Sequence, residues 1–132
     1  MATYSKIITI QPQDLDELKH VNNVRYVEFI QDISKEHWNS TVAPIQREHL
    51  IWVVRNHNIT YYESAVLHDT VKISTKVSSW RAPISLREVE MHNNKTGKLL
   101  VMARTEWCAL HPKTLRPTRV PEDIQRLFAP EK

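Results

Sequence analysis

A single long amphipathic helix, predicted over Asn23 to Trp38, is the feature that most constrains how this chain can fold. At a rise of 1.5 Å per residue it is about 24 Å long, enough to cross a sheet. Apolar side chains recur along it at helical spacing and form a broad stripe. This stripe consists of Val24, Val27, Ile30 and Ile33, is widened by Tyr26 and Phe29, and ends one turn later at His37 or Trp38. Because such a stripe must be buried, the rest of the chain has to supply an apolar surface for it.

Strands are predicted to supply that surface. Tyr4 to Ile10, before the helix, alternates well enough for a first strand. After a turn over Ser40 to Leu50 with a short helix near Pro44, four long segments have the β-branched, aromatic or alternating residues of strands. They are Ile51 to Tyr62, Asp69 to Trp80, Ile84 to His92 and Leu99 to Leu110. The last predicted element is a short helix over Glu122 to Phe128, begun by Pro121 at position N1.

This order of elements indicates the α+β class. Successive strands joined by tight turns pair antiparallel, and the only large helix can cover only one face of their sheet. We therefore expect one long central helix wrapped by an antiparallel five-stranded sheet. The other sheet face carries apolar or aromatic side chains, including Trp80, and part of it is expected to meet another subunit.

Length and composition favour one globular domain over residues 1–132, since a chain of 132 residues with 41% hydrophobic content can bury a core without disulfides. The single cysteine, Cys108, excludes an internal disulfide and suits a reducing cytosol, so a cytoplasmic location is expected. Met1 to Gln13 lacks the pattern of a signal peptide, and no apolar run approaches the length of a membrane span.

Composition also excludes several functional classes. A net charge of +3 without a basic block gives no support for nucleic-acid binding. There is one glycine, Gly97, whereas Gly-rich phosphate loops and the G-x-S-x-G nucleophile elbow need more. The seven histidines show no metal-binding spacing, so no metal site is expected.

The start of the long helix is the candidate site. Asn22 suits the N-cap, and Val21 with Tyr26 has the spacing of a hydrophobic staple. The first turn, Asn23 to Arg25, contains no acidic residue, so its backbone N–H groups are left to polarise an anion or a carbonyl oxygen.

Groups that can transfer protons or attack a carbonyl lie directly upstream, at Asp14, Asp16 and His20. Carboxylate, imidazole and helix N-terminus converging on one point are compatible with an acyl-transfer site. The alternative is a polar loop capped by an asparagine, with solvated acids.

These residues resemble the hotdog-fold acyl-CoA thioesterases, the group that includes 4-hydroxybenzoyl-CoA thioesterase. The resemblance covers nearly the whole chain. Its most specific part is similar to the family pattern D-x-D-x-x-G-H-V-N-N-x-x-Y and comprises Asp14, Leu15, Asp16, His20, Val21, Asn22, Asn23 and Tyr26. Two further stretches, Ile59 to Asp69 and His111 to Pro121, resemble the second-to-third strand connection and the closing turn. The family fold, a helix wrapped by an antiparallel sheet and paired into dimers or tetramers, agrees with the expected order of elements.

The resemblance implies hydrolysis of an acyl thioester to a free acid and a thiol, with Asp16 as nucleophile or as base for water. His20 is the second catalytic candidate, either orienting substrate or water or holding the loop by hydrogen bonds. The amides of Asn23 and Val24 would stabilise the carbonyl oxygen, and Tyr26 would be a staple residue and pocket wall. Coenzyme A enters as part of the substrate, with no other cofactor, and a homodimer or homotetramer is expected.

Two positions depart from the related patterns. The plant acyl-carrier-protein thioesterases share a related loop, but Leu18 stands where their first Asn would be. Lys19 replaces the usual Gly, which implies a loop that is shaped differently or strained. Glu63 is a possible second acid. For Arg81, Arg87, Lys95 and Lys98, a solvated charge at a strand end is favoured over a contact with coenzyme A phosphates.

Three alternatives to an acyl-CoA thioesterase stay open on the sequence: an acyl-carrier-protein thioesterase, a hotdog module that binds a thioester or a protein partner without turnover, and a dehydratase of the same fold. The helix lacks the His-to-acid spacing of the dehydratases, which argues against the last.

Overall fold

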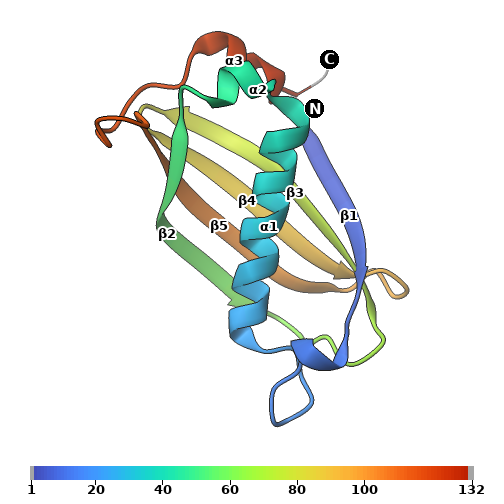
Figure 1. The fold of residues 1–132 in the computed structure, drawn as a ribbon. Helices are drawn as coiled ribbons and strands as arrows, with labels where there is room; N and C mark the ends of the chain where they lie inside the picture. Colours follow the sequence, from blue (N-terminus) through green and yellow to red (C-terminus); the bar gives the residue numbers. More distant parts are fainter. Residues whose placement is uncertain (1, 131–132) are drawn as a thin grey trace.

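A computed structural model describes residues 2–130, and it contains one long helix lying across one face of a five-stranded antiparallel sheet (Figure 1). The strand order is β1-β3-β4-β5-β2. The strands are β1 (Thr3–Thr9), β2 (Ile51–Tyr61), β3 (Thr70–Arg81), β4 (Ile84–Asn93) and β5 (Leu99–Leu110). The helices are α1 (Asn23–Thr41), α2 (Pro44–Arg47) and α3 (Glu122–Leu127), with a 3-10 turn η1 (Pro12–Asp14). The predicted α+β fold is confirmed.

The predicted elements match the observed ones within a few residues at their ends, and the largest difference is at the end of α1. α1 continues past Trp38 to Thr41, and the amide of Val42 closes it by donating to the carbonyl of Trp38 at 3.0 Å. Pro121 is the N-cap of α3 and not its first helical residue.

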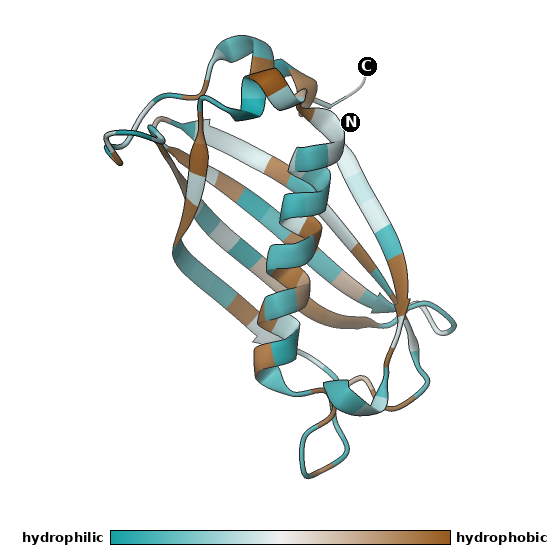
Figure 2. Cartoon of the chain, in the orientation of Figure 1, coloured by the Kyte–Doolittle hydropathy of each residue, from teal (hydrophilic) through white to brown (hydrophobic). Residues whose placement is uncertain are grey.

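The buried face of α1 differs in part from the predicted stripe. Its buried residues are Tyr26, Phe29, Ile30, Ile33, Ser34 and His37. Val24, predicted to start the stripe, is 66% exposed because it lies two and a half turns before Ile33 and therefore on the opposite side of the helix from the buried residues. The hydropathy pattern in Figure 2 follows this division, with polar residues running along the side of α1 that faces away from the sheet.

A shift in strand register corrects the prediction for Trp80, which was expected on the outer sheet face. The pairing of β3 with β4 is irregular between Val77 and Ser79, so the alternation of side chains moves by one residue. Trp80 therefore turns to the helix side, where its ring lies 5.9 Å from that of Phe128. The side chain expected to meet another subunit is part of the interior of this one.

The interior consists of two apolar clusters. The first packs the N-terminal half of α1 against the middle strands and includes Tyr26, Phe29, Ile30 and Ile33. The second lies at the opposite end, where Val42, Leu50, Ile124 and Phe128 pack together. Burying each such side chain contributes about 1.5–3 kcal/mol, so these clusters fix α1 on the sheet.

A row of polar side chains, three buried and one half-buried, crosses the inner sheet face. His57, Thr105 and Arg87 occupy facing positions on β2, β5 and β4, and Thr75 on β3 bonds to Arg87. His37 of α1 meets the same row through Arg87. Among residues 2–130, no helix is both long and apolar enough to cross a membrane.

Candidate active site at the start of the long helix

Asn22 caps α1 as the sequence predicts. Its side-chain oxygen accepts a hydrogen bond from the amide of Val24 at 2.9 Å. Val21 and Tyr26, the two residues of the predicted staple, are both buried in the first apolar cluster. The cap therefore fixes the point at which the chain leaves the upstream loop and enters the helix.

Asp14 supports this junction from inside. Its carboxylate is buried and accepts hydrogen bonds from the amide of Gln11 at 2.8 Å and from Nε of Arg25 at 2.6 Å. The ion pair with Asp14 raises the pKa of Arg25 above its usual value. Nothing in the sequence spacing indicates the pair between Asp14 and Arg25, which forms only because the loop folds back over the first helical turn.

Asp16 sits in a tight loop that projects from the end of the molecule (Figure 1). Its Oδ1 accepts hydrogen bonds from the amides of Leu18 at 2.9 Å and His20 at 3.1 Å. In the described part of the chain, its Oδ2 has no hydrogen-bond partner. One carboxylate oxygen is thus fixed by two backbone amides, and the other has no partner among residues 2–130.

Lys19 adopts the backbone conformation that the glycine of the family pattern would favour. Its φ is 64°, in the left-handed region that costs a non-glycine residue about 1–2 kcal/mol. The loop therefore keeps a glycine-like shape and carries strain at Lys19.

The connection between β2 and β3 also holds the loop that carries Asp16. The sequence did not indicate this connection as part of the site. The amide of Val21 donates to the carbonyl of Ala65 at 3.1 Å, and His20 forms a β-bridge with Val66. A contact between segments so far apart in the sequence depends on the sheet register, so no local motif signals it.

An open hollow at the start of α1 brings together Asp16 and the helix cap. It is lined by Leu15, Asp16, Glu17, Leu18 and Asn22. Of the two amides expected to stabilise the carbonyl oxygen, that of Val24 already donates to the Asn22 side chain. The amide of Asn23 has no partner among residues 2–130 and is the remaining candidate donor.

The structure also places His20 and Tyr26, the other two predicted site residues. His20 holds the loop through its backbone, since its carbonyl accepts from the amide of Asp16 at 2.7 Å, while its exposed imidazole has no hydrogen bond to residues 2–130. The hydroxyl of Tyr26 is buried and accepts a hydrogen bond from the amide of Ala65 at 3.0 Å. Burial also raises the pKa of Tyr26. Tyr26 lies outside the lining of the hollow at Asp16.

Two other charged residues of the sequence analysis are placed by the structure. Glu63 is exposed and pairs with Lys98 at 3.4 Å. Arg87 was expected among the solvated strand-end charges, but it lies in the middle of β4 and is 5% exposed. This position on the inner face of the sheet corrects the expectation of a solvated charge at a strand end.

Comparison with known proteins shows which family the chain belongs to. The profile described as the acyl-ACP thioesterase N-terminal domain matches residues 2–128. The palmitoyl-acyl carrier protein thioesterase of Gossypium hirsutum is 26% identical over 84 residues, which are 64% of this chain and 20% of that protein. The chain thus spans about one fifth of the length of this curated relative.

Solved structures share the fold at low sequence identity. The probable thioesterase YbaW from Escherichia coli superposes with a TM-score of 0.83 at 21% identity, covering 94% of this chain and 95% of that one. A variant of 4-hydroxybenzoyl-CoA thioesterase in complex with 4-hydroxybenzoyl-CoA gives a TM-score of 0.87 at 16% identity, covering 98% and 100%. The resemblance to hotdog-fold thioesterases that the sequence indicated is confirmed.

Proposed function

Because the chain belongs to the family of acyl-ACP thioesterase N-terminal domains, we propose that it hydrolyses an acyl thioester to a free acid and a thiol. The observation that carries the proposal is the Asp16 carboxylate in an open hollow at the start of α1. One of its oxygens is held by two amides, and the other has no partner among residues 2–130. A carboxylate is a competent nucleophile or general base for this reaction.

Two routes use the same carboxylate. As nucleophile, Asp16 attacks the thioester carbonyl carbon, the C–S bond breaks, the thiolate leaves, and water then hydrolyses the resulting anhydride. As base, Asp16 takes a proton from water while the water oxygen attacks, and the departing thiolate ends as the thiol. In both routes the amide of Asn23 donates to the carbonyl oxygen as negative charge develops.

The carrier of the acyl group is coenzyme A or an acyl carrier protein. The sequence pattern favours coenzyme A. The family of the chain and its similarity to the Gossypium hirsutum thioesterase favour a carrier protein, and this is the second candidate function. Coenzyme A in this scheme is part of the substrate, and the chemistry on Asp16 needs no other cofactor.

A second copy of the chain is proposed to complete the site. The loop that carries Asp16 projects from the body, and apolar side chains around it are exposed to solvent. Leu18, Val24 and Val66 are three of them. A homodimer or homotetramer in which another subunit covers these side chains supplies the missing wall of the hollow. The free thiol of Cys108 fits a cytoplasmic location.

A panel of acyl thioesters, monitored by release of free thiol, tests the proposal. Coenzyme A esters of aliphatic and aromatic acids form one arm, and the same acyl groups on an acyl carrier protein form the other. Hydrolysis in either arm supports the proposal, and the ratio of kcat/KM between the arms identifies the carrier. Binding of the esters without any thiol release would show a binding module and overturn the proposal.

A further inference from the structure

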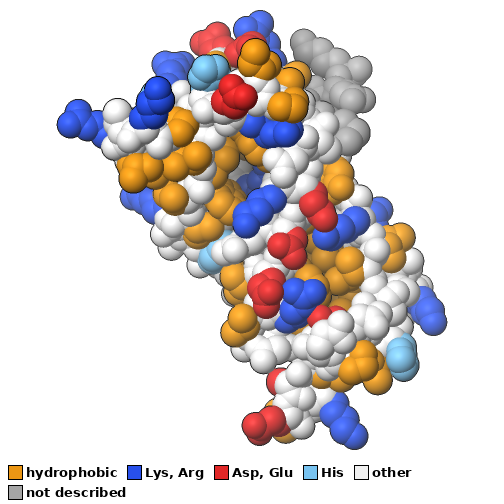
Figure 3. Space-filling model, in the orientation of Figure 1, with side chains coloured by type: hydrophobic (Ala, Val, Ile, Leu, Met, Phe, Trp, Pro, Cys, Tyr) orange, Lys and Arg blue, Asp and Glu red, His pale blue; other side chains and the backbone are white. Residues whose placement is uncertain are grey.

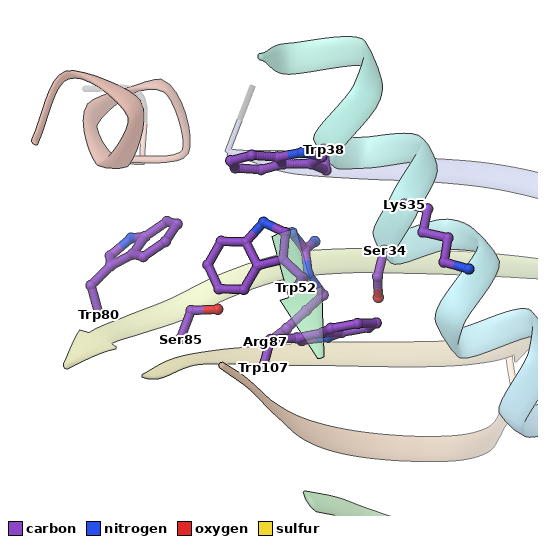
Figure 4. A pocket seen from close by; sticks show the side chains of 8 residues that line it. All are labelled: Ser34, Lys35, Trp38, Trp52, Trp80, Ser85, Arg87 and Trp107. Atoms are coloured by element: carbon purple, nitrogen blue, oxygen red, sulfur yellow. The ribbon is translucent and has the colours of Figure 1, made fainter. Parts of the chain in front are cut away.

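A second hollow lies inside the molecule, between α1 and the β2 side of the sheet. Its cavity volume is about 50 Å³, and the space rises to about 380 Å³ when the mouth that opens to solvent is included. Figure 3 shows the surface hollowed between β2 and α1. The lining residues are Ser34, Lys35, Trp38, Trp52, Trp80, Ser85, Arg87 and Trp107, drawn in Figure 4. All four tryptophans of the chain are among them.

This hollow is separate from the one at Asp16. The two share no lining residue. Ser34 follows Asn23 by eleven residues, which corresponds to about 16 Å along the helix. Within one chain, a short acyl group held at the start of α1 therefore does not reach the tryptophans.

Two of the lining side chains have buried donors without an acceptor. The indole Nε1 atoms of Trp52 and Trp107 are buried, and no hydrogen-bond partner for them exists within residues 2–130. Trp107 as a whole is 8% exposed. An indole N–H can only donate, and a buried donor without an acceptor is unfavourable. These two groups therefore call for an acceptor.

Arg87 adds a buried cation to the same hollow. Its Nη1 donates to Nδ1 of His37 at 2.8 Å and to Oγ1 of Thr75 at 3.2 Å. No carboxylate of the described residues forms an ion pair with it. Burial lowers the pKa of Arg87 to about 10, which still leaves the guanidinium charged at neutral pH.

We propose that this hollow binds an organic carboxylate, with the anionic group near Arg87 and the hydrocarbon part packed against the tryptophan rings. The guanidinium group matches a carboxylate in charge and in its paired-donor geometry. None of the eight lining residues is acidic, and the indole N–H groups add uncharged donors. The aromatic walls favour an acid with an apolar body over an inorganic anion. Such a carboxylate comes from a free acid or from the far end of an acyl group.

Tryptophan fluorescence reports this site directly, because every tryptophan of the chain lines it. The probes are benzoate and hexanoate, with benzamide and hexanamide as uncharged controls. We expect a saturable change with the acids and at least about tenfold weaker binding of the amides. Arg87→Gln weakens binding of the acids by about tenfold or more. Arg104→Gln, which changes an exposed arginine on β5, leaves binding as in the wild type.

A second variant covers the case in which Arg87→Gln fails to fold. Trp107→Phe keeps an aromatic ring and removes one buried donor, and it weakens the acids by about tenfold relative to the amides. The proposal is overturned if acids and amides bind equally, if neither gives a saturable signal, or if the well-folded variants bind the acids as the wild type does.

A thioester arm identifies the source of the carboxylate. Coenzyme A esters with a terminal carboxylate are compared with plain acyl esters of the same length. If the carboxylated esters have a lower KM than the plain esters, and Arg87→Gln removes this difference, the carboxylate bound near Arg87 belongs to the substrate. Binding of free acids without this preference assigns it to a separate acid. The fluorescence arm does not depend on hydrolysis, so a failure of the proposed thioesterase activity is distinguishable from a failure of this site.

Discussion

The carboxylate of Asp14 and the guanidinium of Arg25 meet across the start of α1, with Oδ1 and Nε 2.6 Å apart. The Asp14 side chain is 4% exposed and that of Arg25 34%. Because the second carboxylate oxygen of Asp14 accepts from the amide of Gln11, this residue joins the upstream loop to the helix. Of the two aspartates in the loop, Asp14 holds the loop on the helix and Asp16 lines the open hollow.

Asp14→Asn is therefore expected to lower stability more than it alters chemistry. The substitution weakens a charge-assisted hydrogen bond at a largely buried position, and we expect a loss of about 1–2 kcal/mol in the free energy of unfolding. Urea titration measures this loss. Glu17→Gln, an exposed acid of the same loop, is the matched control and is expected to change stability by less than about 0.5 kcal/mol. Equal midpoints for both variants would contradict the structural role of Asp14.

Asn22→Ala tests the helix cap. The side chain of Asn22 is the acceptor for the amide of Val24, and its loss is expected to cost about 1 kcal/mol. Turnover is also expected to slow, since the same turn presents the amide of Asn23. The neighbouring substitution Asn23→Ala removes an amide side chain that has no hydrogen bond to residues 2–130, so it serves as the stability control. If the two variants melt together, the cap does not contribute as proposed.

His57 gives stability a defined pH dependence. Its Nδ1 shares a 2.8 Å hydrogen bond with Thr105, its Nε2 is buried without a partner in residues 2–130, and burial lowers its pKa. The folded state therefore disfavours the protonated ring, and the unfolded chain binds the proton more readily. Neutral His57 therefore makes its full contribution to the free energy of unfolding above the ordinary histidine pKa of about 6.5, and this contribution is lost as the pH falls below that value.

His57→Gln is expected to flatten this dependence. Between about pH 7.5 and about pH 5, the wild type should lose more of its free energy of unfolding than the variant does. His49→Gln, which changes an exposed histidine, should keep the slope of the wild type. A slope that stays the same in His57→Gln would assign the pH dependence to other groups.

The sequence predicted the order and class of the elements because periodicity is a local property. The alternation of Val101, Ala103, Thr105 and Trp107 is visible in the chain itself, and the structure places all four inward on β5. Trp80 was misplaced for a physical reason. The irregularity between Val77 and Ser79 depends on how β3 pairs with β4, and no residue near it marks the shift.

The candidate site was predictable only where its contacts are local. Asn22 as N-cap follows from residue type and position, and the structure confirms it. The pairing of Asp14 with Arg25, the support from Ala65 and the burial of Arg87 all depend on long-range packing. Arg87 in particular stands between Leu86 and Glu88 in a half-polar strand, where the sequence alone favours a surface position.

Assembly is the next prediction. One chain has a mass of 15.5 kDa, and sedimentation at micromolar concentration is expected to give at least twice that value. Leu18→Cys in a Cys108→Ser background, labelled with a polarity-sensitive dye, should report a shielded environment at concentrations where the oligomer forms. The same label at Arg119→Cys, an exposed position near α3, is the comparison. A monomeric chain, or a Leu18 label as exposed as the Arg119 label, would rule out a second subunit as the wall of the site.

Asp16→Asn separates an enzyme from a binding module. The amide has the shape of the carboxylate, and its oxygen can still accept from the amides of Leu18 and His20, so the fold and thioester binding should survive. An amide neither attacks a thioester nor takes a proton from water. Turnover is therefore expected to fall by about 10²–10⁴-fold, the loss typical of a missing general base, and further if Asp16 is the nucleophile. Thiol release with the best thioester of the panel measures the change. Asp14→Asn, assayed at a temperature where it remains folded, should retain much more of its turnover. The opposite ranking of the two variants would reverse the roles assigned to these acids.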